Sequence, residues 1–449
     1  MRLLHILSQR PGRSGSGVFL GAMVREAGKR ARYEQHAIVG GPPGTTAAEL
    51  PPLRDDQLSV IVFPSDDAPF PVPGNSDVMP YPTTVFSAMT ETQVEQYLRA
   101  ARRVMERVRD TFRPDVVHAH HLWMMTALAR EVFSDIPVIA TSHNAELRQL
   151  VKAPHLARHV IPGVRQLDAV CVLTPQSVTD TIAAYGVDPG RIAITGAGFD
   201  AEIFGPGAVI LSRVDGEGPP ALDASRATGR GSFAALRRLR MTGEPPPQFT
   251  FVGRLSTPKG IPFLLEAVRM LDVPCRLVLA GASGSGADGA HIDALVRDAD
   301  IDVRHTGALP QEEIAEILRE SHAFVLPSLF EGLPLTMLEA LACGTPAIVS
   351  GLPTIASWVP AEWQRDGAVE LIPPLATTNA DVPVESDVPR FTRDIAAALR
   401  RKIDHPFVER EALARRLEPH SWSAVFERYE RIYDTCTHSR LPYSSTARS

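Results

Sequence analysis

The segment FEGLPLTMLEALACGTP (330–346) carries two glutamates, Glu331 and Glu339, that are eight positions apart. Gly332-Leu333-Pro334 is typical of a helix start, and Gly344 is typical of a helix end. We therefore predict that Glu331 precedes a helix and that Glu339 lies about two turns inside it. With about 1.5 Å of rise per residue, the two carboxylates would lie about 12 Å apart along the helix axis. That distance is close to the span from a sugar ring, across a diphosphate, to a ribose.

The start of this helix is expected to bind an anion. Gly332 leaves room for a phosphate beside the unpaired backbone N–H groups near Leu333 and Leu335. Strand-like runs at 322–326 and 347–350 would place the helix start at the carboxyl edge of a sheet, where ligands bind. Glu339 stands among apolar neighbours, where a carboxylate normally needs a partner. A solvated loop acid and a solvated helix acid are the plainer alternative, but the pattern favours a nucleotide-sugar site.

A second segment, FVGRLSTPKG (251–260), supplies cations. Gly253 and Arg254 follow a predicted strand, and Lys259 comes just before a predicted helix. Two cations at this place would hold a diphosphate and stabilise it as a leaving group. The alternative is a solvated basic loop, but lysine is rare in this chain, which favours the diphosphate clamp.

Together, the two segments resemble the Glu-x7-Glu signature and phosphate loop of the retaining glycosyltransferases of family 4, also called glycosyl transferases group 1. The resemblance implies an α/β chain of the GT-B fold, with two Rossmann-like doubly wound domains facing a central cleft. It implies that Glu339 binds the ribose hydroxyls and that Glu331 binds the sugar hydroxyls. It also implies that the reaction retains the anomeric configuration.

Histidines lie at the ends of two predicted buried strands, in DVVHAHHLW (115–123) and VIATSHNAEL (138–147). His143 matches the family's histidine near the reacting sugar, where a neutral imidazole can bind a hydroxyl. For His118, a core histidine is as good an interpretation as a functional one. The residues predicted to bind the acceptor are His118, His120, Asn144, Glu146 and Arg148.

Glycine loops follow several predicted strands. Gly15 and Gly17 open the first helix and could approach a phosphate, although a plain turn is a serious competitor. The segment GASGSGADG (281–289) contains a GxGxxG pattern, but it follows the second strand of its domain and lacks the acid that a dinucleotide site needs. We therefore expect no NAD and no other cofactor, and the resemblance makes Gly281 a candidate near the nucleobase.

Two further acidic features are interpreted as structural. Asp298-Ala-Asp300 mimics a metal-binding DxD motif, but it falls at the end of a helix, so no metal is expected. The turn GAGFDAEIF (196–204) resembles a family turn without its asparagine, and Asp200 within it is interpreted as structural.

The composition bounds the class of protein. The chain has 449 residues, 44% hydrophobic and 22% charged, which suits a globular protein of two or three domains. Its net charge of −6 argues against nucleic-acid binding, and it has no apolar run long enough to span a membrane. Its four cysteines have no CxxC spacing, which suggests free thiols in the cytoplasm. The oligomeric state does not follow from the sequence.

The first predicted domain, 1–204, binds the acceptor, and a C-terminal helix at 421–436 packs back onto it. Residues 205–245 are predicted to be a linker or insertion. The second predicted domain, 246–420, binds the donor. Residues 64–90, 205–231 and 436–449 are expected to be irregular. The first half should contain strands at 2–8, 35–40, 59–63, 115–118, 137–141 and 168–173, with helices at 18–30 and 91–111. The second half should contain strands beginning near Phe249, Arg276, Val303 and Phe324, with helices at 260–270, 290–299 and 311–319.

The predicted activity is transfer of a sugar from a GDP- or UDP-sugar to a small soluble acceptor, such as a natural-product intermediate or a small thiol. His143, Glu331, Arg254 and Lys259 would serve the reaction, without a metal and by front-face departure and attack. The alternatives are a nucleotide-sugar epimerase or a phosphorylase on the same fold, or a non-catalytic nucleotide-sugar-binding homologue.

Overall fold

The computed structural model describes residues 1–12, 14–76, 79, 81–207, 245–284, 286–379 and 381–438. The chain divides into two compact units. Unit 1 is Met1–Gly198 with Trp422–Ser449, and unit 2 is Phe199–Ser421. Most of the predicted insertion and most of the C-terminal tail lie outside the described residues.

Unit 1 is built on a seven-stranded parallel sheet in the order β3-β2-β1-β6-β7-β8-β9. The sequence winds outward from β1 in one direction and from β6 in the other, so the sheet is doubly wound, as predicted. The strands are β1 (Arg2–Leu7), β2 (Glu34–Gly41), β3 (Leu58–Val62), β6 (Val116–His120), β7 (Val138–Thr141), β8 (Ala169–Val172) and β9 (Ile192–Ile194).

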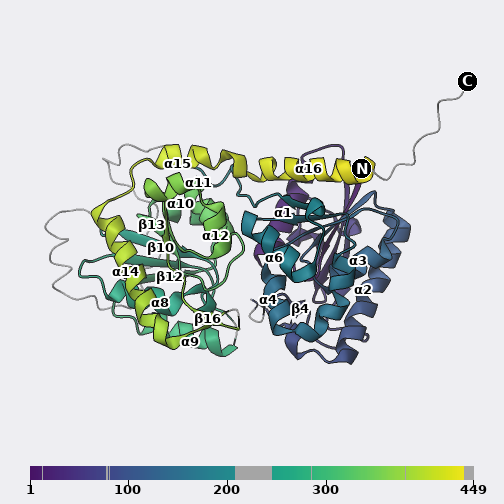
Figure 1. Ribbon diagram of the computed structural model, residues 1–449, viewed down its shortest axis with the longest axis horizontal. Helices are drawn as coiled ribbons and strands as arrows, with labels where there is room; N and C mark the ends of the chain where they lie inside the picture. The colour runs from purple at the N-terminus through teal and green to yellow at the C-terminus, as the bar shows by residue number, and fades with distance from the viewer. Residues whose placement is uncertain are drawn as a thin grey trace, which may run out of the picture. The chain divides into compact units, whose positions relative to one another are not determined.

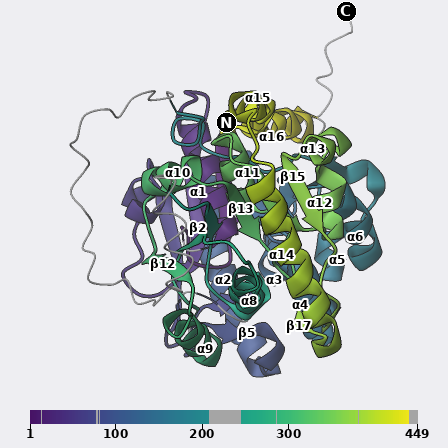
Figure 2. The same cartoon turned by 90° about the vertical axis from the view of Figure 1, so that its left-hand side faces the viewer.

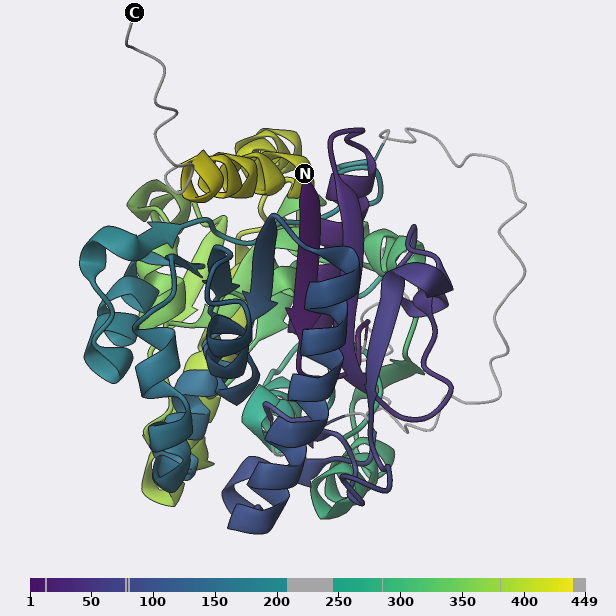
Figure 3. The ribbon, with the colours of Figure 1, turned by 90° about the vertical axis from the view of Figure 1, so that its right-hand side faces the viewer.

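Helices cover both faces of this sheet (Figures 1 and 3). α2, α3 and α5 pack together on one face, and α1 packs with α16 on the other. The helices of unit 1 are α1 (Gly15–Gly28), α2 (Glu91–Phe112), α3 (Met124–Val132), α4 (Ala145–Lys152), α5 (Ile161–Val164), α6 (Pro175–Tyr185) and α16 (Trp422–His438).

Helix α16 is bound to unit 1 by hydroxyl groups that reach into the core. The Tyr429 hydroxyl lies 2.8 Å from Thr141 Oγ1, and the Tyr433 hydroxyl lies 2.8 Å from a ring nitrogen of His118. Both tyrosines are fully buried. The C-terminal helix therefore completes the core of the unit that contains the N-terminus.

Unit 2 is built on a six-stranded parallel sheet in the order β12-β11-β10-β13-β14-β15, again doubly wound. A small antiparallel pair, β16 with β17, is separate from it. The strands are β10 (Gln248–Val252), β11 (Arg276–Ala280), β12 (Asp302–Gly307), β13 (Ala323–Leu326), β14 (Ala347–Ser350), β15 (Val369–Ile372), β16 (Thr377–Thr378) and β17 (Val382–Pro383).

The helices of unit 2 also form two layers. α8 packs against α9 and α14, which Figure 2 shows in front of the sheet, and α11 packs against α10 and α15. The helices are α8 (Ile261–Arg269), α9 (Gly286–Arg297), α10 (Gln311–Arg319), α11 (Leu335–Ala342), α12 (Pro353–Trp358), α13 (Ala361–Arg365), α14 (Val388–Asp404) and α15 (Arg410–Arg416).

The predicted strands and helices are present, with shifts at some ends. α1 begins at Gly15 rather than 18, because Ser14 caps it by accepting a hydrogen bond from Gly17 N–H. α9 begins at Gly286 rather than 290. In the proline-rich stretch 64–90, the strands among the described residues are two residues long, β4 (Pro73–Gly74) and β5 (Thr84–Val85), and a 3-10 turn (Phe86–Ala88) follows them. This confirms that the stretch is no central strand. No helix in the described ranges combines the length and the apolar character needed to cross a bilayer.

Candidate functional site

The loop after β10 is held in place by close backbone contacts. Gly253 and Gly281 have φ angles of 146° and 152°, and a Cβ on Gly281 would lie 1.9 Å from the Gly253 carbonyl oxygen. Gly260 has a φ angle of 81°, and a Cβ there would lie 2.1 Å from the Pro327 carbonyl oxygen. These glycines bring the β10 loop directly against the neighbouring strand ends, and packing alone requires Gly281 to be glycine.

Lys259 ends a 3-10 turn (Thr257–Lys259) in this loop and forms an ion pair with Glu331. The two residues come from the two motifs singled out in the sequence, 72 positions apart. Their side chains are 28% and 11% exposed, respectively, so the pair lies at the protein surface but is largely shielded from solvent. The sequence predicted that both residues belong to one site, but not that they contact each other.

Helix α11 begins just after Glu331. Pro334 is the residue directly before the helix, not a residue of its first turn as predicted. Glu339 therefore lies just over one turn inside the helix, rather than about two. Gly344 ends the helix with a φ angle of 74°, as predicted. Within the described residues, the N–H groups of Leu333 and Leu335 donate no hydrogen bond to the protein. They are available to an anion, as expected for a helix start that binds a phosphate.

Glu339 is a buried carboxyl group. The residue is 7% exposed, and in the described part of the chain its side chain has no hydrogen bond or ion pair. Burial, and then the negative charge of Asp200, raise the pKa of the Glu339 carboxyl to about 7. Asp200 is 139 positions away, and nothing in the sequence indicates that it faces Glu339. A buried carboxylate without a hydrogen-bond partner is stabilised by a ligand whose hydroxyl groups donate hydrogen bonds to it.

Arg254 lies directly after Gly253 and is partly buried, in the same loop as Lys259. Asp288 holds this loop in place, because its carboxylate accepts a hydrogen bond from Thr257 N–H at 3.2 Å. On the other side, Thr354 Oγ1 donates to the Glu331 carbonyl oxygen at 2.9 Å. These supports, which the sequence did not indicate, hold the motifs in register.

In unit 1, the ends of β6 and β7 carry the predicted histidines. His118 is fully buried, and its two ring nitrogens lie 2.7 Å from Thr141 Oγ1 and 2.8 Å from the Tyr433 hydroxyl. This geometry corresponds to the core-histidine alternative, because neither nitrogen is free for an acceptor.

His143 is partly buried, and its Nε2 shares a 3.1 Å hydrogen bond with Nδ1 of the buried His120. Burial lowers the pKa of His143 to about 3, so the ring is neutral at physiological pH. Burial also lowers the pKa of His120 well below its usual value. The neutral imidazole expected at His143 is therefore consistent with its surroundings.

The other predicted acceptor residues lie deeper. Glu146 has no exposed side-chain surface, and Arg148 is buried. Asn144 is also buried, and its side-chain oxygen Oδ1 accepts a hydrogen bond from Ser177 Oγ at 3.1 Å. Direct contact with an acceptor, expected from the sequence, does not fit a carboxylate with no exposed surface. Glu146 is hydrogen-bonded instead to backbone at the ends of β6 and β7.

At the start of α1, a Cβ on Gly17 would lie 2.6 Å from Gly12 N, whereas a Cβ on Gly15 would meet nothing within 4 Å. The plain-turn alternative therefore accounts for Gly17. Gly15 lies in open space at the helix start, and nothing in its packing requires a glycine.

Neither of the two metal-like clusters suits an ion. Asp300 pairs with Arg269 at 2.8 Å on the surface. His5, His118 and His120 bring three ring nitrogens within 4.8 Å of one another. However, the His118 nitrogens are both hydrogen-bonded, and the His118 and His120 rings stack at 4.6 Å. Stacked rings direct their nitrogens alongside each other rather than at a shared ion.

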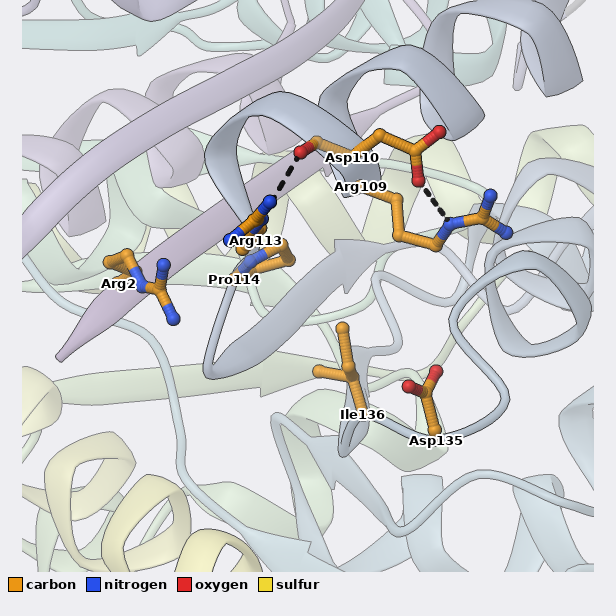
Figure 4. Close-up of a pocket in the computed structure, with 7 residues that line it drawn as sticks. All are labelled: Arg2, Arg109, Asp110, Arg113, Pro114, Asp135 and Ile136. Atoms are coloured by element: carbon orange, nitrogen blue, oxygen red, sulfur yellow. Dashed lines mark hydrogen bonds and ion pairs between the residues drawn. The ribbon is translucent and has the colours of Figure 1, made fainter.

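A surface hollow of about 450 Å³ lies at the opposite edge of the unit 1 sheet, near the start of β1 and the end of α2 (Figure 4). Arg2 pairs with Asp115 beside it, and Arg109 pairs with Asp110 on its rim. These are exposed ion pairs, and the hollow is remote from the strand ends that carry the candidate residues.

Known proteins resemble both halves of the chain. The sequence profile of the Glycosyl transferases group 1 matches residues 237–362, and that of Glycosyltransferase Family 4 matches residues 44–203. Two curated relatives are D-inositol 3-phosphate glycosyltransferases. The one from Kribbella flavida is 27% identical over 63% of this chain and 64% of its own length, and the one from Mycobacterium bovis is 30% identical over 53% and 48%. The chain thus spans about half to just under two thirds of these relatives' length.

Among solved structures, the Anabaena protein HepE in complex with UDP-glucose aligns with a TM-score of 0.62, at 14% identity, over 96% of this chain and 99% of its own. This similarity confirms the predicted GT-B type of fold, with two α/β doubly wound domains.

Proposed function

Because this chain belongs to the group 1 family of glycosyltransferases, we propose that it transfers a sugar from a nucleoside diphosphate sugar to a small hydroxyl- or thiol-bearing acceptor. The observation that supports this most is a convergence among the described residues of unit 2. It joins the Lys259–Glu331 ion pair, the free N–H groups at the start of α11, and the unpartnered Glu339. Lys259 and the helix start suit the diphosphate, Glu331 suits the sugar, and the buried Glu339 suits the ribose.

In this proposal, the ribose hydroxyls donate to Glu339, and the diphosphate lies against the start of α11. The negative diphosphate competes with Glu331 for the Lys259 ammonium. Donor binding would therefore release Glu331 from its ion pair, so that it can accept hydrogen bonds from the sugar hydroxyls. Gly253 and Gly281 would let the backbone come close to the nucleotide.

The reaction is a displacement at the anomeric carbon. The bond from that carbon to the diphosphate oxygen breaks, and the acceptor oxygen or sulfur bonds to the carbon on the same face. The acceptor's proton passes to the departing diphosphate. Lys259, Arg254 and the helix start stabilise the charge on this leaving group, the kind of electrostatic contribution that typically amounts to about 3–4 kcal/mol per donor.

Unit 1 would bind the acceptor. His143, a neutral ring at the end of β7, is the proposed contact to a hydroxyl of the transferred sugar or of the acceptor. The curated relatives are named for an inositol phosphate acceptor, so a phosphorylated polyol belongs among the acceptors to be tested, together with neutral polyols and small thiols.

A ligand panel tests the donor side. UDP, GDP, ADP and TDP are compared by thermal shift, since a ligand at 100 times its dissociation constant adds about 2.7 kcal/mol of stability. The best nucleotide's sugar conjugates are then incubated with each acceptor, and the products are identified by mass spectrometry and by the anomeric coupling in NMR. Stabilisation by a nucleoside diphosphate, abolished in Lys259→Ala but not in Lys29→Ala, supports the site.

Two results would contradict the proposal. Turnover of a nucleotide sugar or a sugar phosphate without any acceptor would indicate an epimerase or a phosphorylase. Tight nucleotide-sugar binding with no product from any acceptor class would indicate a binding protein.

A further inference from the structure

The ends of β6 and β7 are held in an unfavourable backbone conformation. His121 follows β6 with a φ angle of 70°, and Asn144 lies just beyond β7 with a φ angle of 66°. Residues other than glycine in this left-handed region typically cost about 1–3 kcal/mol each, and they persist only where their surroundings hold them. Two such residues at adjacent strand ends require a specific restraint.

One carboxylate provides that restraint. Glu146 Oε1 accepts hydrogen bonds from Leu122 N–H at 3.2 Å and from His143 N–H at 3.0 Å. Glu146 Oε2 accepts from the His121 ring Nδ1 at 3.1 Å. Leu122 follows one left-handed residue directly, and His143 precedes the other directly. Glu146 therefore ties the two strand ends together across the sheet.

The carboxylate is charged although it is buried. Burial is the largest single influence and raises the pKa of this carboxyl. The hydrogen bond with the His121 ring, the electrostatic influence of His121 and His143 and a backbone hydrogen bond together outweigh it, so the pKa of Glu146 falls to about 2. Its side chain has no solvent-exposed surface. Each side-chain hydrogen bond of Glu146 goes to a residue at the end of β6 or of β7. The carboxylate is therefore not placed to contact a substrate as well.

We propose that Glu146 is a positioning residue that fixes the backbone of His143, and with it the direction in which the His143 ring meets the reacting sugar. The role of His143 rests on the proposed function, but the placement of His143 by Glu146 does not. Positioning of this kind matters because a displacement of about 1 Å in a reacting group can cost roughly 100-fold in rate.

The geometry separates positioning from charge. In Glu146→Gln, the side-chain oxygen can keep both backbone hydrogen bonds, because both go to Oε1, while the amide donates to His121 Nδ1 in its other tautomer. In Glu146→Asp, the charge remains but the carboxylate is withdrawn by one methylene. Positioning therefore predicts that the glutamine variant is the more active one, whereas an electrostatic role predicts that the aspartate variant is.

The experiment measures kcat and KM for donor and acceptor in Glu146→Gln, Glu146→Asp, Glu146→Ala and His143→Ala. Glu26→Ala serves as the control, because Glu26 on α1 is another buried acid of unit 1, paired with Lys29 and Arg30 just after the helix. We expect kcat to fall on the order of 100-fold in the aspartate variant, with the donor KM within about threefold of wild type. Combining His143→Ala with Glu146→Asp should cost no more than His143→Ala alone.

A second readout needs no turnover. In protein labelled with ¹³C and ¹⁵N at histidine, the His143 ring signals, assigned by their loss in His143→Ala, should shift less in Glu146→Gln than in Glu146→Asp. Unchanged signals in the aspartate variant would overturn the positioning role, as would an aspartate variant with wild-type kcat or one more active than the glutamine variant. A wild-type protein that transfers no sugar would refute the proposed function and leave the NMR result standing.

Discussion

Nucleoside binding should become tighter as the pH rises from about 6 to about 8. The free Glu339 carboxyl has a pKa raised to about 7 by burial and by Asp200. Ribose hydroxyls donate hydrogen bonds to the ionised form, so they bind the ionised protein in preference. Binding therefore draws a proton off Glu339, and the affinity must follow the fraction of Glu339 that is already ionised.

The expected size follows from the pKa. With a value of about 7, roughly one tenth of the carboxyls are ionised at pH 6 and nine tenths at pH 8, so the association constant should rise about tenfold. The rise of the Glu339 pKa from 4.5 to about 7 means that the folded protein favours the protonated carboxyl by about 3 kcal/mol more than an exposed site would, since each pKa unit is about 1.36 kcal/mol. Because the folded-state pKa is raised, the folded protein without ligand binds the extra proton. Its stability should therefore fall as the pH rises from about 4.5 to about 7.

Isothermal titration calorimetry with nucleosides gives the cleanest assay, because uridine and guanosine carry no phosphate that titrates in this range. Repeating each titration in buffers of different ionisation enthalpy measures the protons released, which should be about half a proton per nucleoside at pH 7. Glu339→Gln is the matched control, since it keeps the size of the side chain and cannot titrate.

A wild-type affinity that stays flat between pH 6 and pH 8 would contradict this prediction, because Glu339 would then be ionised in the free protein or remote from the ribose. A tenfold rise that persists in Glu339→Gln would contradict it as well, because some other group would then be responsible.

Lys259→Ala and Arg254→Ala should each lower kcat/KM roughly 100- to 1,000-fold with unchanged circular dichroism, and near-wild-type rates at saturating donor would show that these cations do not hold the diphosphate. Glu331→Gln should leave the calorimetric affinity for nucleoside diphosphate almost unchanged while turnover drops, so an equal loss of both would contradict its place on the sugar side. Activity should survive excess EDTA, and a complete loss restored by manganese would refute the cation clamp. Gly260→Ala should destabilise the protein by about 2 kcal/mol or more in urea unfolding, because it combines a left-handed φ with a Cβ 2.1 Å from the Pro327 oxygen, and an unchanged midpoint would mean that the loop moves freely.

The sequence predicts best what depends on neighbouring residues. The stop of α11 at Gly344 and the start of α8 after Gly260 depend on local backbone preferences, and both are found where expected. The start of α1 is predicted too late because Gly15 and Gly17 have low helix propensity, which the cap at Ser14 overcomes.

Contacts between strand ends could not be read from the chain. The bonds of Glu146 depend on β6 and β7 being neighbours with a particular register, and on the left-handed turn at His121. Similarly, the pairing of Lys259 with Glu331 and the approach of Asp200 to Glu339 join positions 72 or more apart. Residue types indicated that these side chains have a role, but only the fold shows which of them contact each other.

Unit 2 is a continuous insert within unit 1, and its two ends meet: Phe199 and Ser421 form an isolated bridge, with Phe199 N–H donating to the His420 carbonyl oxygen at 3.2 Å. A ribosome must therefore finish the whole insert before Tyr429 and Tyr433 emerge to complete the first core. The same topology makes the molecule divisible in the laboratory. Residues 199–421 can be produced as one uninterrupted polypeptide, while a short glycine linker from Gly198 to Trp422 would restore the remainder.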